Sequence, residues 1–407
     1  MRDAVGVLAD GSGGRGVYAI GGAVRDVLLG RAVHDLDLAT EVDAIGLVRS
    51  ALPGARVAEH RRFRTATVRV DGVRIDLATC RSETYGRPGA LPRVTQAPIE
   101  HDLRRRDFGV NALALRLDGM PELLDPCGGL DDLRERRIRV LHEASFRDDA
   151  TRVFRAFRYA ARLGFALDAG TLTLLERDVS YVDSVGGERL RRELELLIAE
   201  ETGSSALADC DGAGAVAAVH PALAWPSGAA AALADPSIPR IPLGFALLAS
   251  SASVAGAEEI VVRLRLKRDQ AAAVRGIAAL RPLVATLRRP TAKPSGVVVL
   301  LDRYPPAAVA AFAGTRGDEI AGRLALRYLA EWRDESTILR GDDLIALGVP
   351  PGPMVQRGLR LIRASRLDGW ASDRDDERAL ALRFAKSIRD SGAANAESTL
   401  EPESHGP

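Results

Sequence analysis

The stretch from Val17 to Thr40, VYAIGGAVRDVLLGRAVHDLDLAT, constrains most strongly what this chain can fold into. It opens with a four-residue apolar run, Val17 to Ile20, which has the length of a buried strand. The pair Gly21-Gly22 interrupts the run, and the pattern then predicts a short helix over 23–29. A strand followed by a glycine turn and a helix predicts an arrangement that mixes α and β elements at this point of the chain.

A second strand is predicted over 34–39, and it carries two aspartates, Asp35 and Asp37. Because side chains alternate along a strand, both carboxylates leave the same face. Two like charges held so close repel each other unless a cation lies between them. Mg²⁺ prefers such oxygen ligands, completed by water and substrate phosphates. An isolated D-x-D is also common on the polar face of an ordinary strand, so the pair alone leaves that alternative open.

The glycines upstream favour the binding of phosphate. Gly21 and Gly22 have no Cβ, so the backbone N–H groups at the start of the helix can approach a phosphate closely. Arg25, about one turn later, adds a charged donor. The stretch therefore predicts a triphosphate cradle that faces a metal-binding pair of carboxylates.

At this point the sequence resembles the nucleotidyltransferase superfamily, specifically the bacterial (class II) tRNA CCA-adding enzymes and their poly(A) polymerase relatives. The family pattern G-G-[AS]-x-R-D, L-x-G and D-x-D is matched by Gly21, Gly22, Ala23, Arg25, Asp26, Leu28, Gly30, Asp35 and Asp37. The resemblance implies an α+β fold, in which an N-terminal nucleotidyltransferase head with a small mixed sheet precedes an all-helical neck, body and tail. It also implies Mg²⁺ held by Asp35 and Asp37.

A third acidic residue, Asp76, lies in the segment 73–78, which is predicted to pair with a strand over 63–70 through a hairpin turn at Asp71-Gly72. Its position between Ile75 and Leu77 points it away from its apolar neighbours, and the pattern alone fits a solvated face equally well. The resemblance implies that Asp76 completes a catalytic set with the D-x-D pair.

The segment 81–100 is rich in Gly, Pro and polar residues and is predicted to be a mobile loop. The following run, HDLRRRDFGVNALAL, contains an arginine cluster that is either a solvated basic face or a neutraliser of phosphate charge. It resembles the family's D-L-x-R-R-D-F-T-x-N-A, with Gly109 in place of the usual Thr. The resemblance implies nucleotide binding by Arg105, Arg106, Asp107 and Asn111.

The segment 146–165 is predicted to be one helix with arginines spaced by three or four residues. Without the resemblance, an amphipathic helix with capping carboxylates is the favoured interpretation. The family has E-D-x-x-R here. The resemblance implies nucleotide binding by Asp148, Asp149, Arg152, Arg155 and Arg158. An Asp acceptor and an Arg donor three residues apart match the edges of cytosine and adenine and refuse those of guanine and uracil.

The remaining sequence predicts helices. Gly187 to Ile198 resembles the family's E-R-[IL]-x-x-E segment, where a salt-bridge role is as well supported as a direct one. The segment 339–353 resembles the tail module that holds the far end of the tRNA in relatives. We expect a catalytic head over 1–140, a base-recognising neck over 141–200, a helical body over 201–275, a tRNA-binding tail over 276–390 and a disordered end over 391–407.

Composition limits the alternatives. The chain has 407 residues, 46% of them hydrophobic, and a formal net charge of +1, so any nucleic-acid surface must be a local patch. Three widely spaced cysteines argue against a disulfide scaffold or zinc site, and we expect a reduced cytoplasm. Neither a signal peptide nor a membrane span is predicted. G-x-G-x-x-G over 11–16 lacks the preceding strand of a dinucleotide site, and we expect a flexible lead-in there.

The resemblance as a whole implies a template-independent RNA nucleotidyltransferase that uses CTP and ATP to add C and/or A to the 3′ end of tRNA by two-metal chemistry. CC-only addition, A-only addition and poly(A) synthesis share these motifs and stay open. A catalytically silent RNA-binding adaptor is the alternative from another class, and the intact D-x-D argues against it. Monomer and homodimer are both compatible with the sequence.

Overall fold

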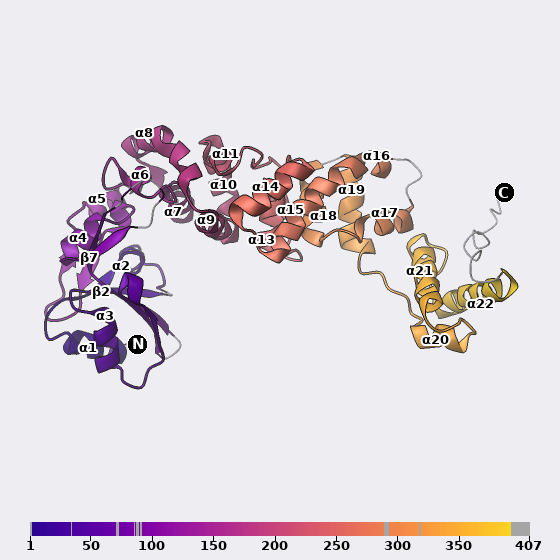
Figure 1. The fold of residues 1–407 in the computed structure, drawn as a ribbon, viewed down its shortest axis with the longest axis horizontal. Helices are drawn as coiled ribbons and strands as arrows, with labels where there is room; N and C mark the ends of the chain where they lie inside the picture. Colours follow the sequence, from indigo (N-terminus) through magenta and orange to yellow (C-terminus); the bar gives the residue numbers. More distant parts are fainter. Residues whose placement is uncertain are drawn as a thin grey trace. The chain divides into compact units, whose positions relative to one another are not determined.

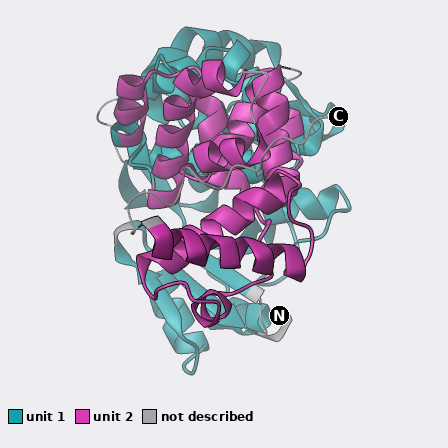
Figure 2. Ribbon diagram, turned by 90° about the vertical axis from the view of Figure 1, so that its right-hand side faces the viewer, with its two compact units in different colours: residues 1–225, 262–266 teal, residues 226–261, 267–407 magenta. Residues whose placement is uncertain are grey.

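The computed structural model describes residues 2–33, 35–70, 73–84, 86, 89, 92–288, 293–316 and 319–391. The chain divides into two compact units, shown in different colours in Figure 2. One comprises residues 1–225 with 262–266, and the other comprises 226–261 with 267–407. The residues expected to form one helical body, 201–275, are thus divided between the two units.

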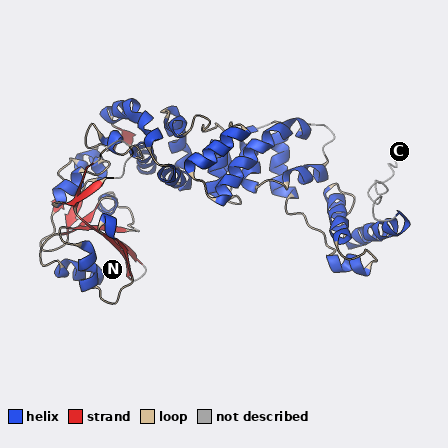
Figure 3. Ribbon diagram, in the orientation of Figure 1, coloured by secondary structure: helices blue, strands red, loops and turns tan. Residues whose placement is uncertain are grey.

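The first unit contains a seven-stranded sheet in the order β3-β4-β5-β2-β1-β8-β9. Its strands are β1 (Val17–Ile20), β2 (Leu36–Thr40), β3 (Val57–His60), β4 (Thr65–Val70), β5 (Val73–Thr79), β8 (Ala114–Arg116) and β9 (Leu123–Leu124). Strand β2 runs parallel to β5, and all other neighbours are antiparallel. The predicted α+β fold with a small mixed sheet is therefore confirmed, with strands gathered near the N-terminal end of the chain (Figure 3).

Two expectations about loops change. The segment 81–100 is not wholly irregular, because β6 (Arg81–Thr84) and β7 (Arg93–Gln96) pair as an antiparallel ribbon. The predicted turn at Asp71-Gly72 lies outside the described residues, although the strands that it joins do pair. A third small sheet joins β10 (Arg137–Ile138) and β11 (Ala166–Leu167) in parallel.

The expected flexible lead-in begins with a helix, α1 (Arg2–Gly11), that buries Leu8 completely. The glycine-rich residues after it are held by Asp118, whose carboxylate accepts hydrogen bonds from the N–H groups of Gly16 and Val17 at 2.8 and 3.0 Å. No local sequence pattern indicates this anchor, because Asp118 lies 102 residues after Gly16. The other helices of this region are α2 (Gly22–Leu28), α3 (Ala44–Ala51), α4 (Ile99–Arg104) and α5 (Gly129–Arg134).

Helices follow the sheet from residue 145 onward, as Figure 1 shows. They are α6 (Ser145–Asp148), α7 (Arg152–Leu163), α8 (Ala169–Asp178), α9 (Gly187–Ala199), α10 (Gly203–Gly212) and α11 (Ala215–Val219). The predicted single helix over 146–165 is therefore wrong, because α6 ends before Asp149 and α7 begins at Arg152. Asp149 has an extended backbone, and its carboxylate accepts the N–H of Thr151, which ends one helix and caps the next.

After Trp225 the helices are α12 (Ala229–Leu233), α13 (Arg240–Leu248), α14 (Val254–Leu264), α15 (Arg268–Leu280), α16 (Val284–Leu287), α17 (Pro294–Leu301), α18 (Pro306–Arg316), α19 (Ile320–Arg327), α20 (Gly341–Ala346), α21 (Pro353–Leu367) and α22 (Arg374–Ser391). Helices α13, α15 and α18 pack on one another. The last three helices enclose a core of their own around Leu344, Ile362 and Phe384.

No single helix in the described ranges is long and apolar enough to cross a bilayer; only the pair α17 and α18, bent by 118°, has the combined length and composition. Within that pair, the run from Ala307 to Ala313 is buried in the second unit, as in the core helix of a folded domain.

Candidate active site

The acidic residues expected to be catalytic lie on adjacent strands of the sheet. Asp37 on β2 is the register partner of Asp76 on β5, because the two strands run parallel. Asp35 lies in a bend directly before β2 and not in the strand itself, which begins at Leu36. Both Asp35 and Asp37 are exposed. The parallel pairing of β2 and β5 therefore places Asp37 beside Asp76, and Asp35 lies two residues before Asp37, outside the strand in which it was predicted.

The three carboxylates differ in their surroundings. The pKa of Asp37 is raised, chiefly because the surrounding protein displaces water from the carboxyl, and further because Asp76 and Asp35 add negative charge. Asp76 is engaged on both oxygens: Thr67 Oγ1 donates to it at 2.5 Å and Arg74 Nη2 lies 2.9 Å away. Among the residues that the structure describes, Asp35 and Asp37 have no hydrogen-bond or ion-pair partner.

The glycine turn lies next to these strands and approaches an arginine from a distant motif. Gly21 has a φ of 63°, which favours glycine, and a Cβ added there would lie 2.9 Å from Arg106 Nη1. Arg106 Nη2 also donates to Asp102 Oδ2 at 3.0 Å, and its charge acts on Asp37. Its Nε is buried, with no hydrogen-bond partner in the described part of the chain. The guanidinium group of Arg106 thus lies beside the turn, and its positive charge acts on a carboxylate of β2.

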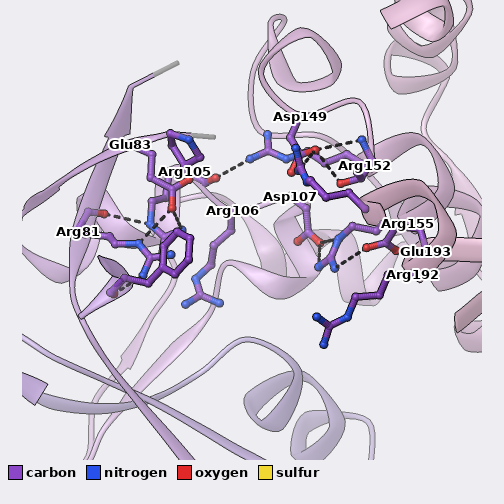
Figure 4. A pocket seen from close by; sticks show the side chains of 14 residues that line it. Arg81, Glu83, Arg105, Arg106, Asp107, Asp149, Arg152, Arg155, Arg192 and Glu193 are labelled. Carbon is purple, nitrogen blue, oxygen red and sulfur yellow. Dashed lines mark hydrogen bonds and ion pairs between the residues drawn. The ribbon is translucent and has the colours of Figure 1, made fainter. Parts of the chain in front are cut away.

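Arg106 also lines a pocket of about 470 Å³ in the first unit (Figure 4). Six residues expected from the sequence line it, namely Arg105, Arg106, Asp107, Asp149, Arg152 and Arg155. The others are Phe63, Arg81, Glu83, Pro92, Thr151, Arg189, Arg192 and Glu193. The wall is therefore made by the β6–β7 ribbon, the segment after α4, the α6–α7 break and α9. Seven arginines give it a strongly positive lining.

Asp149 and Arg152, the expected readers of the base edge, are both fixed by other groups. Asp149 Oδ1 accepts hydrogen bonds from Thr151 Oγ1 and Arg189 Nη2, each at 2.7 Å. Arg152 is buried; its Nη1 donates to Ser145 Oγ at 2.7 Å, and its Nη2 donates to the carbonyl of Arg105 at 2.8 Å. The two residues share the pocket wall, but Asp149 lies in the break before α7 and not on the same helix as Arg152.

A buried network connects the glycine helix to the pocket. Arg25 is 2% exposed and donates from Nη1 to Asn111 Oδ1 at 2.6 Å. Asn111 Nδ2 donates to Asp107 Oδ1 at 3.0 Å, and Arg155 Nε donates to Asp107 Oδ2 at 2.9 Å. Although burial alone would raise it, the charge of Arg155 and the hydrogen bond from Asn111 hold the pKa of Asp107 at about 2. Arg25 and Asn111 therefore lie inside this network and do not line the pocket.

Two further expected nucleotide ligands lie elsewhere. Arg158 is 6% exposed and is flanked by Glu193 and Glu200 at 3.8 and 3.7 Å, outside the pocket lining. Asp148 faces His142, at 3.9 Å, in a smaller neighbouring hollow. Asp148 and Arg158 therefore do not line the same pocket as the six other residues, because α6 ends between Asp148 and Asp149 and the helical turn places Arg158 against Glu193 and Glu200.

The sequence missed the contribution of the ribbon. Glu83 on β6 forms ion pairs with Arg81 at 3.1 Å and with Arg105 at 2.8 Å, so it orients an arginine of the pocket. Alternating residues in RSET and RVTQ were the only available strand signal. Tyr159 was also missed: the guanidinium groups of Arg25, Arg155 and Arg158 lie 5.3, 5.6 and 5.0 Å from its ring centre.

Comparison with known proteins identifies the family to which this chain belongs. Residues 17–139 match the model of the poly A polymerase head domain. A CC-adding tRNA nucleotidyltransferase of Deinococcus radiodurans is 36% identical over 371 residues, which cover 89% of this chain and 88% of the relative. The chain belongs to the tRNA nucleotidyltransferase family.

Other members of the family extend beyond the aligned part. The chain is 35% identical over 399 residues to an A-adding tRNA nucleotidyltransferase of Geobacter sulfurreducens, a match that covers 91% of this chain but 45% of the relative's length. The solved structure of the Thermotoga maritima CCA-adding enzyme complexed with tRNA(CCA) matches with a TM-score of 0.76 and 26% identity, over 93% of each chain.

A nucleotidyltransferase head implies a divalent metal ion, and the acidic residues of this chain fit one. The carboxylates of Asp35 and Asp37 form no ion pair in the described ranges, and desolvation, followed by the like charges of Asp76 and Asp35, raises the pKa of Asp37. No three His, Cys, Asp or Glu side chains among the described residues are grouped closely enough to hold a metal by themselves. Two carboxylates completed by water and phosphate oxygens suit a hard cation that keeps part of its hydration shell.

Proposed function

We propose that the protein adds C and/or A to the 3′ end of tRNA, using CTP and ATP without a nucleic-acid template. The observation that carries the proposal is the position of Arg106: its Nη1 lies against the glycine turn, its charge acts on Asp37, and its side chain lines the pocket. A nucleotide with its base in the pocket and its phosphates at Arg106 would present its α-phosphate to the carboxylates.

The chemistry is a displacement at phosphorus. The oxygen of the primer's 3′-hydroxyl forms a bond to the α-phosphorus, the bond to the β-phosphate oxygen breaks, and pyrophosphate leaves while the hydroxyl proton passes to solvent. Mg²⁺ bound by Asp35 and Asp37, with Asp76 beside them, would lower the pKa of the hydroxyl and neutralise charge on the phosphates. Arg105 and Arg106 would bind phosphate oxygens, and Gly21 and Gly22 would let the backbone approach them.

Base choice would fall to Asp149 and Arg152 in the proposed neck, residues 141–200. Their acceptor and donor groups complement the amino group and ring nitrogen of cytosine and adenine. Partners already fix both side chains, and a preorganised site loses less entropy on binding. The proposed head would be 1–140, and the proposed tRNA-binding tail 276–390.

Relatives differ in what their names say they add: A for the Geobacter protein, CC for the Deinococcus protein and CCA for the Thermotoga protein. The experiment that tests the proposal therefore supplies all three possible primers. Purified protein is incubated with tRNAs that end at the discriminator base, at C or at CC, with each nucleoside triphosphate and with Mg²⁺, Mn²⁺ or Ca²⁺, and the products are sequenced.

If the protein adds only CC to the tRNA that ends at the discriminator base, it is a CC-adding enzyme. If it extends only the tRNA that ends in CC, and adds A to it, it is an A-adding enzyme. A long run of A on any primer would assign poly(A) synthesis. Binding of tRNA without extension of any primer, with every cation, would overturn the proposal in favour of a silent RNA-binding adaptor.

A further inference from the structure

A groove of about 280 Å³ lies between α17 and α21 in the second unit. Val298, Val299, Ala364 and Leu367 give it an apolar lining, and Val299 is 60% exposed. Arg303 and Arg360 line it as well. An accessible apolar strip beside basic side chains suits a ligand with a flat apolar part and negative charge.

Polar contacts between the two helices fix the direction of the groove. Ser295 Oγ near the start of α17 donates to Asp368 Oδ2 just beyond α21, at 2.7 Å. Arg363 Nη1 donates to Asp302 Oδ2 just after α17, also at 2.7 Å. The helices therefore run in opposite directions. Both acidic side chains are already engaged, which leaves the positive charges of the groove uncompensated.

The Arg303 end of the groove carries the uncompensated charge. Arg303 and Arg360 are exposed, and neither has an acidic partner within the described ranges. Arg360 donates only a long hydrogen bond, of 3.4 Å, from Nε to the carbonyl of Gln356. Exposed guanidinium groups of this kind bind phosphate oxygens readily.

The opposite end of the groove carries an exposed aromatic ring. Trp370 follows Asp368 by two residues and is 46% exposed, whereas Trp225 and Trp332 are 9% and 7% exposed. The ammonium group of Lys293, which directly precedes α17, lies 4.5 Å from the centre of the Trp370 ring. An indole ring with a neighbouring cation is suited to stack on a nucleobase while the cation meets a phosphate.

We propose that this groove binds an unstacked nucleotide in a looped part of the RNA substrate. The base would lie against Trp370 and the apolar strip, and the flanking phosphates would contact Lys293 at one end and Arg303 and Arg360 at the other. The inference rests on the proposed function, because it takes RNA to be the substrate. Charge complementarity favours RNA over a second copy of this chain, whose same groove would bring the same positive charge. A continuous duplex hides the faces of its bases, so the groove discriminates looped RNA from duplex RNA.

The first test compares Trp370→Ala with Leu382→Ala, which removes an equally exposed apolar side chain, 45%, from α22. Affinities of the full chain are measured for a complete tRNA and for a short acceptor duplex without loops. Trp370→Ala should weaken tRNA binding about five- to a hundred-fold, the range for loss of one base stack, and should leave duplex binding within two-fold. Trp370→Phe should restore most of the lost affinity, and Leu382→Ala should match the wild type.

Charge is tested by the salt dependence of tRNA binding. Arg303→Ala and Arg360→Ala should each reduce the slope of log K against log salt by about 1, because each removes one phosphate contact. Arg383→Ala, which removes an exposed arginine of α22, should leave the slope unchanged. An equal reduction by Arg383→Ala would show a diffuse charge effect and would overturn the proposal.

Three other results would also overturn the proposal. Trp370→Ala could leave the affinity for tRNA unchanged, or it could weaken the binding of tRNA and of the duplex equally. Sedimentation could also show that the wild-type protein is a dimer and that Trp370→Ala dissociates it, which would make the groove a contact between two copies of the chain. The proposed function is judged separately, by whether the wild-type protein extends the duplex. Extension of the duplex together with unchanged tRNA binding by Trp370→Ala would reject the groove alone.

Discussion

At the start of β2, a central strand of the sheet, the carboxylates of Asp35 and Asp37 have no ion-pair partner among the residues that the structure describes, whereas three carboxylates at or near the pocket are each paired with arginine. Asp102 pairs with Arg105 and Arg106, Asp107 with Arg155, and Asp149 with Arg189. The pKa of Asp37 is raised, and the pKa values of Asp102 and Asp107 are lowered. Both regions contain partly or fully desolvated carboxylates and belong to one compact unit, so the partner arginines make the difference.

This difference in pairing suggests different roles for the carboxylates at the start of β2 and those around the pocket. A carboxylate whose charge is already balanced can position its partner and hold a pocket in shape, but it has little left to offer a cation. A crowded carboxylate without a partner is destabilising by itself, and a metal ion relieves that cost. The following substitutions test the contrast, beginning with the largest expected effect.

Asp37→Ala should reduce nucleotide transfer by roughly a thousand-fold or more for CTP and ATP alike, because loss of a metal ligand removes several kcal/mol of transition-state stabilisation. The melting temperature should stay the same or rise, since the substitution relieves repulsion from Asp76 and Asp35. Transfer rates and thermal melts check both statements. Asp131→Ala, at an exposed acid of α5, is the control. A low melting temperature in Asp37→Ala would place the residue in the structural group instead.

Asp107→Ala should destabilise the fold by about 3 kcal/mol, because it leaves the Arg155 charge and the Asn111 amide without their buried acceptor. Urea unfolding measures the loss. Nearly unchanged stability would mean that the network is not tightly coupled.

Acid unfolding provides an independent check on Asp107. Its folded pKa of about 2 lies below the ordinary value of 3.8, so the carboxylate contributes stability above pH 4, and this contribution is lost as the pH falls toward 2. The shift corresponds to about 2 kcal/mol. Asp107→Asn should therefore show a flatter dependence of unfolding free energy on pH between about 4 and 2 than the wild type.

Asp149→Ala and Arg152→Ala should narrow the preference for CTP and ATP over UTP and GTP by about ten- to a hundred-fold, since each leaves a polar group of the base unpaired at a cost of about 1–3 kcal/mol. The measurement is kcat/KM for all four nucleotides, beside melting temperature. A purely structural role for Asp149 at the α6–α7 break predicts a lower melting temperature with base preference unchanged.

Ser145→Ala should have the smallest effect, a few-fold loss of base discrimination, because it removes one of the hydrogen bonds that orient Arg152, worth about 1 kcal/mol. The Arg105 carbonyl still holds the other nitrogen of the guanidinium group. Separate measurement of KM and kcat distinguishes loss of Arg152 orientation from a general loss of folding. If only the orientation of Arg152 is lost, KM should rise for CTP and ATP, whereas kcat/KM for UTP should stay constant. Equal changes for all nucleotides would argue for a general loss of structure.

The same contrast shows where sequence reasoning succeeded. The D-x-D pair and the glycine turn could be placed together because strand alternation and short loops are local properties. Asp76, the RRD run and the segment beginning at Asp149 were assigned to the site through family resemblance, and six residues of the last two segments do line one pocket. The mixed sheet and the helical arrangement after it were also implied by that resemblance.

The sequence did not show which charged side chains pair with one another. Arg25 and Arg106 are both arginines beside a glycine turn or an acidic motif, yet Asn111 and Asp26 occupy the first, whereas the second keeps a free Nε among the described residues. Similarly, Asp148 and Asp149 are adjacent in the chain, and only the end of α6 directs them into different hollows. Spacing along the chain does not encode which of two equal charges finds a partner from a distant element.

The sequence by itself determined the kind of protein this is, because the glycine turn, the D-x-D pair and the arginine motifs occur together in the order typical of a nucleotidyltransferase. Tertiary structure alone decided which charges are balanced and which remain available. Salt bridges and buried hydrogen bonds join residues up to about a hundred positions apart, such as Arg25 with Asn111 and Gly16 with Asp118. Their energies depend on burial and distance, which exist only once the chain has folded.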